Sequence, residues 1–179
     1  MTNKTFEDLI KEVHEKGICQ ECGGCVSFCS AADYDVINFV DPYSPPQYIN
    51  KDNCLECGIC YYICPQTHVL DDDLDNEYQF AEYSSMPIGY YREIYSCQSK
   101  DAEFLKYGTD GGVVNTIINY LIKNDKIKGS IVSKTEKPFL REANYANSKE
   151  ELINSSGTQL DVSPHLEELQ KFSTYTQCK

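Results

Sequence analysis

Two cysteine-rich stretches decide the fold: CQECGGCVSFC at residues 19–29 and CLECGICYYICP at residues 54–65. Each has the spacing Cys-x2-Cys-x2-Cys-x3-Cys, which is the ligand run of bacterial-type ferredoxins that hold [4Fe-4S] clusters. Three thiolates from one tight loop can bind three corners of a cubane, and the glycines within both loops let the backbone come close. The second run ends in Pro65, whereas Ser30 stands at the equivalent place of the first.

The fourth cysteine of each run is expected to bind the cluster of the other run, as in two-cluster ferredoxins. One cubane would take three thiolates of the first run and the last of the second: Cys19, Cys22, Cys25 and Cys64. The other cubane would take the remaining four: Cys29, Cys54, Cys57 and Cys60. A pair of zinc sites is the alternative, but zinc needs only paired Cys-x2-Cys arms and leaves half of the cysteines unexplained. The sequence therefore predicts two [4Fe-4S] clusters and an electron-transfer role.

The other candidate ligands stand alone in the sequence. Cys97 and Cys178 lie outside both runs, and an isolated cysteine is most often a small buried hydrophobe. His14, His68 and His165 have no partner at ligand spacing, so surface or helix-capping roles are expected for them.

The composition restricts the class of partner. The 179 residues carry a formal net charge of -12, which disfavours nucleic acid and anionic membranes and favours a basic redox partner or a protein subunit. No apolar run approaches the roughly 18 residues of a transmembrane segment, and the start of the chain is polar and acidic rather than a signal peptide. A cytoplasmic protein is expected, in which ten cysteines indicate metal binding before disulfides.

The first 70 residues are expected to form one domain around the two runs. Thr5 can cap a helix that ends at Gly17 and whose apolar residues recur at helical spacing: Phe6, Leu9, Ile10 and Val13. Between the runs, residues 36–40 and 47–50 are expected to pair as two short strands.

A solvated linker is expected over residues 71–95. The stretch Asp71–Glu77 is acidic and shows no hydrophobic periodicity, and a polar, tyrosine-rich passage follows it.

The pattern changes to α/β from residue 96 onward. An apolar stripe predicts a helix over Val113–Lys123, and a compact apolar segment predicts a strand over residues 127–133. Two further helices are expected, one after the capping box formed by Ser148 with Glu151 and one after Ser163-Pro164.

A glycine-rich loop opens the helix of residues 113–123. It runs Gly108-Thr109-Asp110-Gly111-Gly112, and its backbone amides could hold a phosphate at the helix N-terminus. A glycine-rich helix entry is as often plain turn chemistry, and this one is neither a Walker loop nor a GxGxxG fingerprint.

The chain resembles the beta-subunit family of coenzyme F-420 hydrogenases and dehydrogenases in four features. These are the paired cysteine runs, the G-x-x-G-G helix entry, the strand Lys128–Val132, and the stretch Ser148–Leu152 that leads to Gly157-Thr158. The resemblance covers nearly the whole chain. It implies that the protein binds FAD and exchanges hydride with the deazaflavin coenzyme F-420. Two clusters ahead of the flavin part look most like the F-420H2 dehydrogenase subunit and the F-420-oxidising part of related sulfite reductases and formate dehydrogenases.

The resemblance also implies flavin contacts. The residues that match the family's flavin-phosphate loop and the helix behind it are Gly108, Asp110, Gly111, Gly112 and Thr116. Those that match the small-residue turn before the flavin are Ser156, Gly157 and Thr158. Asp110, where many relatives have serine, could instead shape the loop.

The expected fold class is α+β. A two-[4Fe-4S] ferredoxin-like domain at residues 1–70 is followed by the linker at 71–95 and the first half of an α/β FAD-binding domain at 96–179. Relatives continue with a further strand and a Pro-Cys-Gln turn where this sequence stops at Cys178-Lys179. A fragment, or a fold that a partner completes, is therefore expected.

The expected function is that of an electron-transfer oxidoreductase subunit. Coenzyme F-420 is its expected substrate, FAD exchanges hydride with it, and the two [4Fe-4S] clusters relay single electrons to a partner subunit or domain. No side chain is expected to act as nucleophile or acid. One alternative is a flavin-free, two-cluster electron carrier with a docking domain, and another is a flavoprotein with a different substrate.

Overall fold

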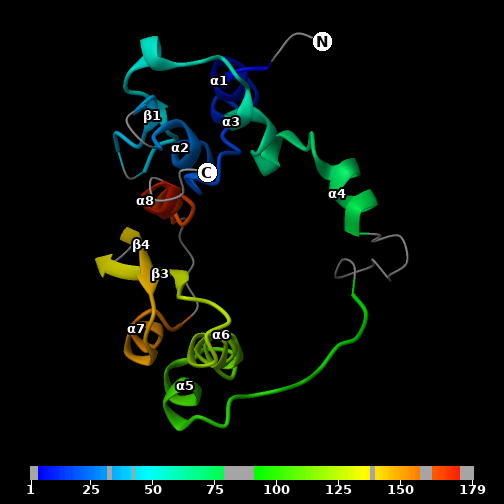
Figure 1. Cartoon of the computed structure of the whole chain (residues 1–179), viewed down its shortest axis with the longest axis vertical. Helices are drawn as coiled ribbons and strands as arrows, with labels where there is room; N and C mark the ends of the chain where they lie inside the picture. Colours follow the sequence, from blue (N-terminus) through cyan, green and yellow to red (C-terminus); the bar gives the residue numbers. More distant parts are fainter. Residues whose placement is uncertain are drawn as a thin grey trace.

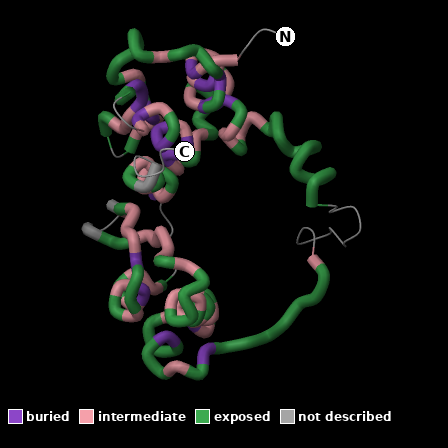
Figure 2. The backbone as a smooth tube through the Cα atoms, in the orientation of Figure 1, coloured by how far each residue is buried: buried purple, intermediate pink, exposed green. Residues whose placement is uncertain are grey.

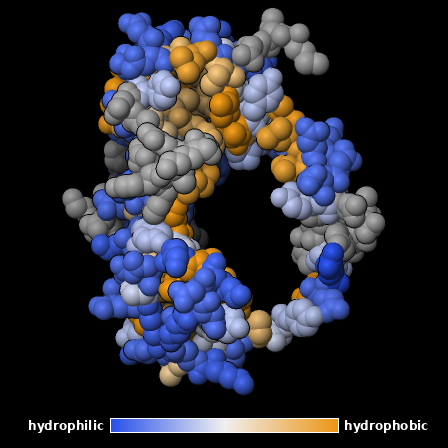
Figure 3. All heavy atoms as spheres, in the orientation of Figure 1, coloured by the Kyte–Doolittle hydropathy of each residue, from blue (hydrophilic) through white to orange (hydrophobic). Residues whose placement is uncertain are grey.

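The computed structural model describes residues 4–31, 34–41, 43–78, 91–137, 140–157 and 163–173. Figure 1 shows a cysteine-rich half, coloured blue to cyan, and an α/β half, coloured green to orange, at opposite ends of the longest axis. In Figure 3 apolar side chains gather on the cysteine-rich half, whereas the visible face of the α/β half is mostly polar.

The chain begins with the predicted helix. It is built from α1 (Phe6–Leu9) and a π-helical turn, η1 (Ile10–His14), and Gly17 follows it with a φ of 67°. The backbone N–H of Thr5 donates to the Asp8 carboxylate at 2.9 Å, which satisfies one of the unpaired donors at the helix start. The expected helix is confirmed, and its apolar face is buried.

Each cysteine run leads into a short helix. These are α2 (Gly24–Cys29) and α3 (Ile59–Tyr62), and each starts after a glycine in the left-handed region, Gly23 or Gly58. Between the runs, β1 (Ile37–Asn38) pairs antiparallel with β2 (Gln47–Tyr48), so the expected hairpin is confirmed with shorter strands. Two 3-10 turns, η2 (Lys51–Asn53) and η3 (Pro65–Thr67), flank the second run.

A hydrophobic cluster joins these elements, and six of the eight run cysteines lie in it or pack against it. Its buried members come from the first helix, α2, the hairpin and α3: Phe6, Leu9, Val13, Val26, Val36, Ile37, Cys60 and Tyr61. Figure 2 shows most of the buried backbone in this half. The core therefore forms around the cysteines rather than apart from them.

Residues 71–78 form a helix, α4 (Asp71–Tyr78), where a linker without periodicity was expected. Its side chains are all exposed, and it stands apart from both halves in Figure 1. Three aspartates in the first turn favour helix formation because they interact with the positive end of the helix dipole. The segment is thus a solvated helix, and residues 92–98 beyond it are exposed as well.

The α/β half contains α5 (Ala102–Tyr107), α6 (Val113–Lys123) and α7 (Lys149–Asn154). The expected bounds of α6 are confirmed, and so is the capping box of α7, in which the Ser148 hydroxyl accepts from the Glu151 N–H. A small core unites the three helices and the strands around Phe104, Ala146 and Leu152.

A long antiparallel hairpin completes this half. It pairs β3 (Ser130–Lys137) with β4 (Leu140–Ala146), with Ser130 opposite Ala146. The strand expected at residues 127–133 therefore starts later and runs further, and β4 was not expected at all.

The last described segment, residues 163–173, returns to the cysteine-rich half. Ser163-Pro164 does not begin a helix directly, because these two residues are irregular and residues 165–166 form a turn that leads to η5 (Glu167–Leu169) and α8 (Gln170–Ser173). The η5 turn contacts both α2 and β4, and α8 lies beside α2 in Figure 1. This segment therefore joins the two halves.

Among the described residues, no helix combines the length and the apolar character needed to cross a bilayer.

Candidate functional site

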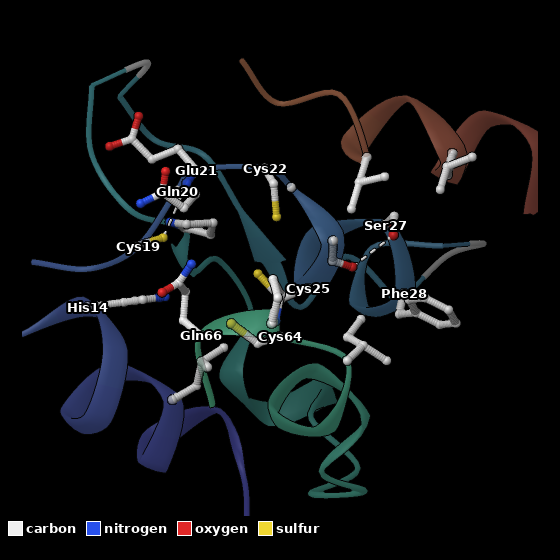
Figure 4. A pocket seen from close by; sticks show the side chains of 18 residues that line it. His14, Cys19, Gln20, Glu21, Cys22, Cys25, Ser27, Phe28, Cys64 and Gln66 are labelled. Atoms are coloured by element: carbon white, nitrogen blue, oxygen red, sulfur yellow. Dashed lines mark hydrogen bonds between the residues drawn. The ribbon is translucent and has the colours of Figure 1, made fainter. Parts of the chain in front are cut away.

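Four cysteines line one cavity in the cysteine-rich half. The cavity measures about 150 Å³ and receives side chains from the first loop and from the end of the second run: Cys19, Cys22, Cys25 and Cys64. In Figure 4 the sulfur atoms of these residues face a common space. Leu9 and His14 of the N-terminal helix and Leu166 and Leu169 of the last segment also line it. The set is the one predicted for the first cubane.

Burial and crowding perturb these thiols. Burial, together with the neighbouring Cys22 and Cys19, raises the pKa of Cys25 to about 12. Burial also raises the pKa values of Cys19 and Cys64. Thiols in such surroundings lose their protons readily only when a metal centre stabilises the thiolates, so the donor set fits a cluster with four thiolate ligands.

Of the second predicted set, the structure brings Cys29 and Cys60 together. Cys29, at the end of α2, forms a hydrogen bond with Cys60 of α3, which lowers the pKa of Cys29 and raises that of Cys60. The Cys54 thiol bonds to the Tyr48 hydroxyl, and Cys57 is exposed. Each fourth cysteine thus lies beside cysteines of the opposite run, which is the placement that crossed ligation requires.

The arrangement of the described side chains also bears on whether one metal ion, such as zinc, could bind. Across the described ranges, no group of three or more histidine, cysteine, aspartate or glutamate side chains is close enough to hold one metal ion. A zinc ion gathers all its ligands within about 2.3 Å of one point. A cubane presents four separate iron atoms to four thiolates and needs no such convergence.

A second cavity, of about 370 Å³, lies in the α/β half between the glycine loop, α6, β3 and the turn after α7. Five of the predicted flavin contacts line it: Gly108, Asp110, Gly112, Ser156 and Gly157. The start of α6 borders it too, so helical N–H groups without intrahelical partners are available to a phosphate there. These residues fit the phosphate end of a dinucleotide.

The other predicted flavin residues lie elsewhere. The Gly111 carbonyl accepts from the Ser99 N–H at 2.7 Å, and Thr116 Oγ1 bonds to the Ser99 hydroxyl at 2.6 Å and to the Gly112 carbonyl at 2.8 Å. Both residues hold the loop against buried Ser99 rather than line the cavity. Thr158 falls outside the described residues.

The glycines of the loop are needed for packing as well. A Cβ on Gly112 would stand 2.2 Å from the Phe104 carbonyl oxygen, and one on Gly108 would stand 2.6 Å from the Gly112 Cα. Gly112 also has a φ of 65°, which other residues adopt only at a cost. Turn chemistry alone can therefore explain why glycine stands at these two positions.

The sequence interpretation missed Asn115. Its amide Nδ2 donates to the Leu152 carbonyl at 3.1 Å and to the Ser156 hydroxyl at 2.7 Å, so it ties α6 to the turn after α7 at the cavity wall. Asn115 is a polar residue in the first turn of a helix that is otherwise mostly apolar. This contrast is the sequence signal that could have identified it.

Two interpretations of isolated residues were wrong. Cys97 is exposed rather than buried, and His14 lines the first cavity, where burial lowers its pKa. His68 forms an ion pair with Asp71 next to α4, and the ring of His165 bonds to the Ser163 carbonyl, as surface and capping roles predict. Cys178 falls outside the described residues.

Comparison with known proteins divides the chain at the same place. Residues 94–170 match the family model described as "Coenzyme F420 hydrogenase/dehydrogenase, beta subunit N-term". Residues 16–33 and 51–78, which include the two cysteine runs, match the model of a 4Fe-4S binding domain.

The individual relatives are also named for coenzyme F420. The chain is 30% identical over 129 residues to a coenzyme F420-dependent sulfite reductase from Methanocaldococcus jannaschii, covering 71% of this chain and 17% of that one. It is 34% identical over 87 residues to a coenzyme F420 hydrogenase subunit beta from Methanothermobacter thermautotrophicus. This match covers 48% of the present chain and 31% of that relative. The match thus spans less than a third of each relative's length.

A chain of the F420-reducing [NiFe] hydrogenase complex from Methanosarcina barkeri is 28% identical to this chain, with a TM-score of 0.41. The match covers 44% of this chain and 27% of the hydrogenase chain. That score is too low to support a statement about the fold. The family resemblance expected from the motifs is confirmed by the family models and the relatives. Through residues 94–170, the chain belongs to the coenzyme F420 hydrogenase/dehydrogenase beta-subunit family, and a 4Fe-4S binding domain precedes that region.

Proposed function

We propose that the chain is the electron-transfer part of a coenzyme F-420-dependent oxidoreductase. In it, the α/β half binds FAD, which exchanges hydride with the deazaflavin, and two [4Fe-4S] clusters relay electrons to a partner subunit or domain. The observation that carries the proposal is the gathering of Cys64 with Cys19, Cys22 and Cys25 around one cavity. A thiolate set drawn from both runs suits two neighbouring cubanes.

The residues of the chain would bind, orient and exclude water. The two thiolate sets would hold the cubanes, and Leu9, Leu166 and Leu169 would keep water from the first. When bound, the flavin would supply the conversion between a hydride and single electrons, and the cubanes would supply the one-electron relay. Ser156, held by Asn115, and the N-terminus of α6 would orient the phosphates.

The flavin half of the proposal can be tested by one charge change in the second cavity. Val114 lines the cavity, and 69% of its surface is exposed, so Val114→Glu adds a negative charge beside the phosphate position without disturbing a core. In the longer chain, or in the complex with the partner that completes the flavin domain, we expect FAD binding, followed by flavin fluorescence, to weaken at least about tenfold, which corresponds to about 1.4 kcal/mol.

The matched control is Ile117→Glu, which adds the same charge on an exposed position of α6 that does not line the cavity. It should bind FAD as the unaltered chain does. Equal affinities for all three proteins would show that FAD does not use this cavity.

The activity is tested with anaerobically purified protein. Reduced deazaflavin should bleach the visible absorbance of the clusters when FAD is present, and should leave it unchanged when FAD is absent. Bleaching by another hydride donor but not by the deazaflavin would indicate a different substrate for the same site.

A flavin-free electron carrier with a docking domain is the second candidate. It is favoured by the finding that Gly108 and Gly112 are required for packing against Phe104, with or without a bound phosphate. On this alternative the chain shows cluster absorbance, binds no FAD and does not respond to the deazaflavin.

A further inference from the structure

The two cysteine runs share one backbone conformation. Gly23 and Gly58, which stand at the same position of each run, have φ values of 79° and 77°. The preceding glutamates, Glu21 and Glu56, have φ values of 49° and 50°. Because the loops themselves are so similar, differences between the two cluster sites arise from the segments that pack on them.

A C-terminal segment, Ser163–Leu169, packs on the first loop; it is called the cover segment below. The Leu166 N–H donates to the Cys22 carbonyl oxygen at 2.8 Å. The cover segment is so close that a Cβ on Gly23 would stand 2.7 Å from the Glu167 nitrogen, and one on Gly24 would stand 3.3 Å from Leu166 Cδ1. Leu166 and Leu169 line the cavity of the first thiolate set.

The second loop is more open. Ile59 is exposed, whereas Gly24, at the equivalent position of the first run, is buried. Leu55 is 72% exposed and Cys57 is exposed, whereas its counterpart Cys22 is half-buried. The contact between the last segment and the first cluster region is seen in η5 packing on α2, together with the bond from Leu166 to Cys22.

We propose that the cover segment positions the first loop and keeps water from the cubane of Cys19, Cys22, Cys25 and Cys64, so that the two clusters differ in potential. This inference rests on the cluster ligation proposed above. Reduction adds a negative charge to a cluster that four thiolates already make anionic, and a site without water disfavours that charge. The covered cluster therefore has the lower midpoint potential. An electron would pass from the covered cluster, which is thereby oxidised, to the second cluster, which is reduced and whose loop exposes Leu55, Cys57 and Ile59.

Leu166 is the positioning residue that tests this arrangement. In the full chain loaded with both clusters, Leu166→Ala keeps the backbone bond to Cys22 but opens the cavity to water. A redox titration followed by electron paramagnetic resonance should show the lower midpoint shifting upward. Exposure to air should release about half of the iron severalfold faster than in the unaltered chain, because one of two cubanes is affected.

Two further variants make the result specific. Ile59→Ala, at the equivalent position of the second run, should leave the lower midpoint unchanged. Leu166→Met, which refills the cavity, should restore the original midpoint and iron retention. If Leu166→Ala fails to fold, Leu169→Ala makes the same test from the other leucine of the cover segment, with the same expected shift.

The outcomes separate this inference from the function on which it rests. An unaltered chain without two clusters would overturn the ligation itself. Alternatively, the chain binds two clusters, and truncation of Leu166 or Leu169 changes neither their potentials nor their air sensitivity. That result would agree with the proposed ligation but would overturn the role of the cover segment.

Discussion

The two cysteine runs have the same sequence spacing and nearly the same loop geometry, but different parts of the chain pack against them. The first run is held from the C-terminal side, through the bond between Leu166 and Cys22. The second is held from the N-terminal side, where the Tyr61 hydroxyl donates to the Glu12 carboxylate and α1 contacts α3. Local sequence thus determines where the thiolates lie, and distant segments determine how much water reaches them.

Removing a fourth cysteine should have the largest effect, because it takes one ligand from a cluster. Cys64→Ser should damage the cubane of the first loop, and Cys29→Ser should damage that of the second, since each thiolate crosses to the opposite run. Each variant should retain about half of the iron. Iron analysis with electron paramagnetic resonance shows which signal is lost, and the lower midpoint should disappear in Cys64→Ser.

The crossed arrangement is wrong if the signal lost in Cys64→Ser is the one that Cys57→Ser also removes, because Cys57 belongs to the second loop.

Gly23→Ala should have the next largest effect. Its φ of 79° costs a non-glycine residue about 1–3 kcal/mol, and the added Cβ would displace Glu167 and with it the cover segment. We expect a lower urea midpoint together with faster iron loss in air.

Gly17→Ala is the matched control for this change. Gly17 has a φ of 67°, and a Cβ there meets nothing within 4 Å, so the variant has the backbone cost without the collision. Equal iron loss in the two variants would contradict the importance of the contact between Gly23 and the cover segment.

Tyr61→Phe should have the smallest effect and should act on the second run. The Glu12 carboxylate, whose pKa is lowered by its bonds to Lys4 and Tyr61, would keep the first of these partners. The variant should therefore lose a little stability in urea, measured by circular dichroism, with no change in the lower midpoint. Tyr62→Phe, which removes a hydroxyl from the more exposed neighbour, serves as the control. A shift of the lower midpoint in Tyr61→Phe would show that the two sites are not separately supported.

Features with a local cause could be predicted from the sequence. The apolar stripe of α6 fixed its bounds at Val113 and Lys123, and the Ser148 and Glu151 pair identified the start of α7. The hairpin between the runs followed from alternating strand and breaker residues. The spacing of the cysteines predicted which four thiols share the first cavity, although not what else lines it.

Features that depend on distant contacts or on weak patterns were missed. β4 has Arg141, Glu142 and Asn144 between its apolar residues without regular alternation, so its own pattern is a weak strand signal, and pairing with β3 completes it. The apolar residues of α4, Leu74 and Tyr78, are both exposed, so no buried face marks this helix, and the aspartates at its start gave a signal only through the helix dipole. The contact between Leu166 and Cys22 joins residues far apart in the chain, and no local pattern encodes it.

Metal and sulfide analysis of the protein purified without oxygen tests the central claim most directly. Two cubanes on the eight cysteines of the runs predict about eight iron and about eight acid-labile sulfide per chain. A content near two zinc, with neither iron nor sulfide, would contradict the account.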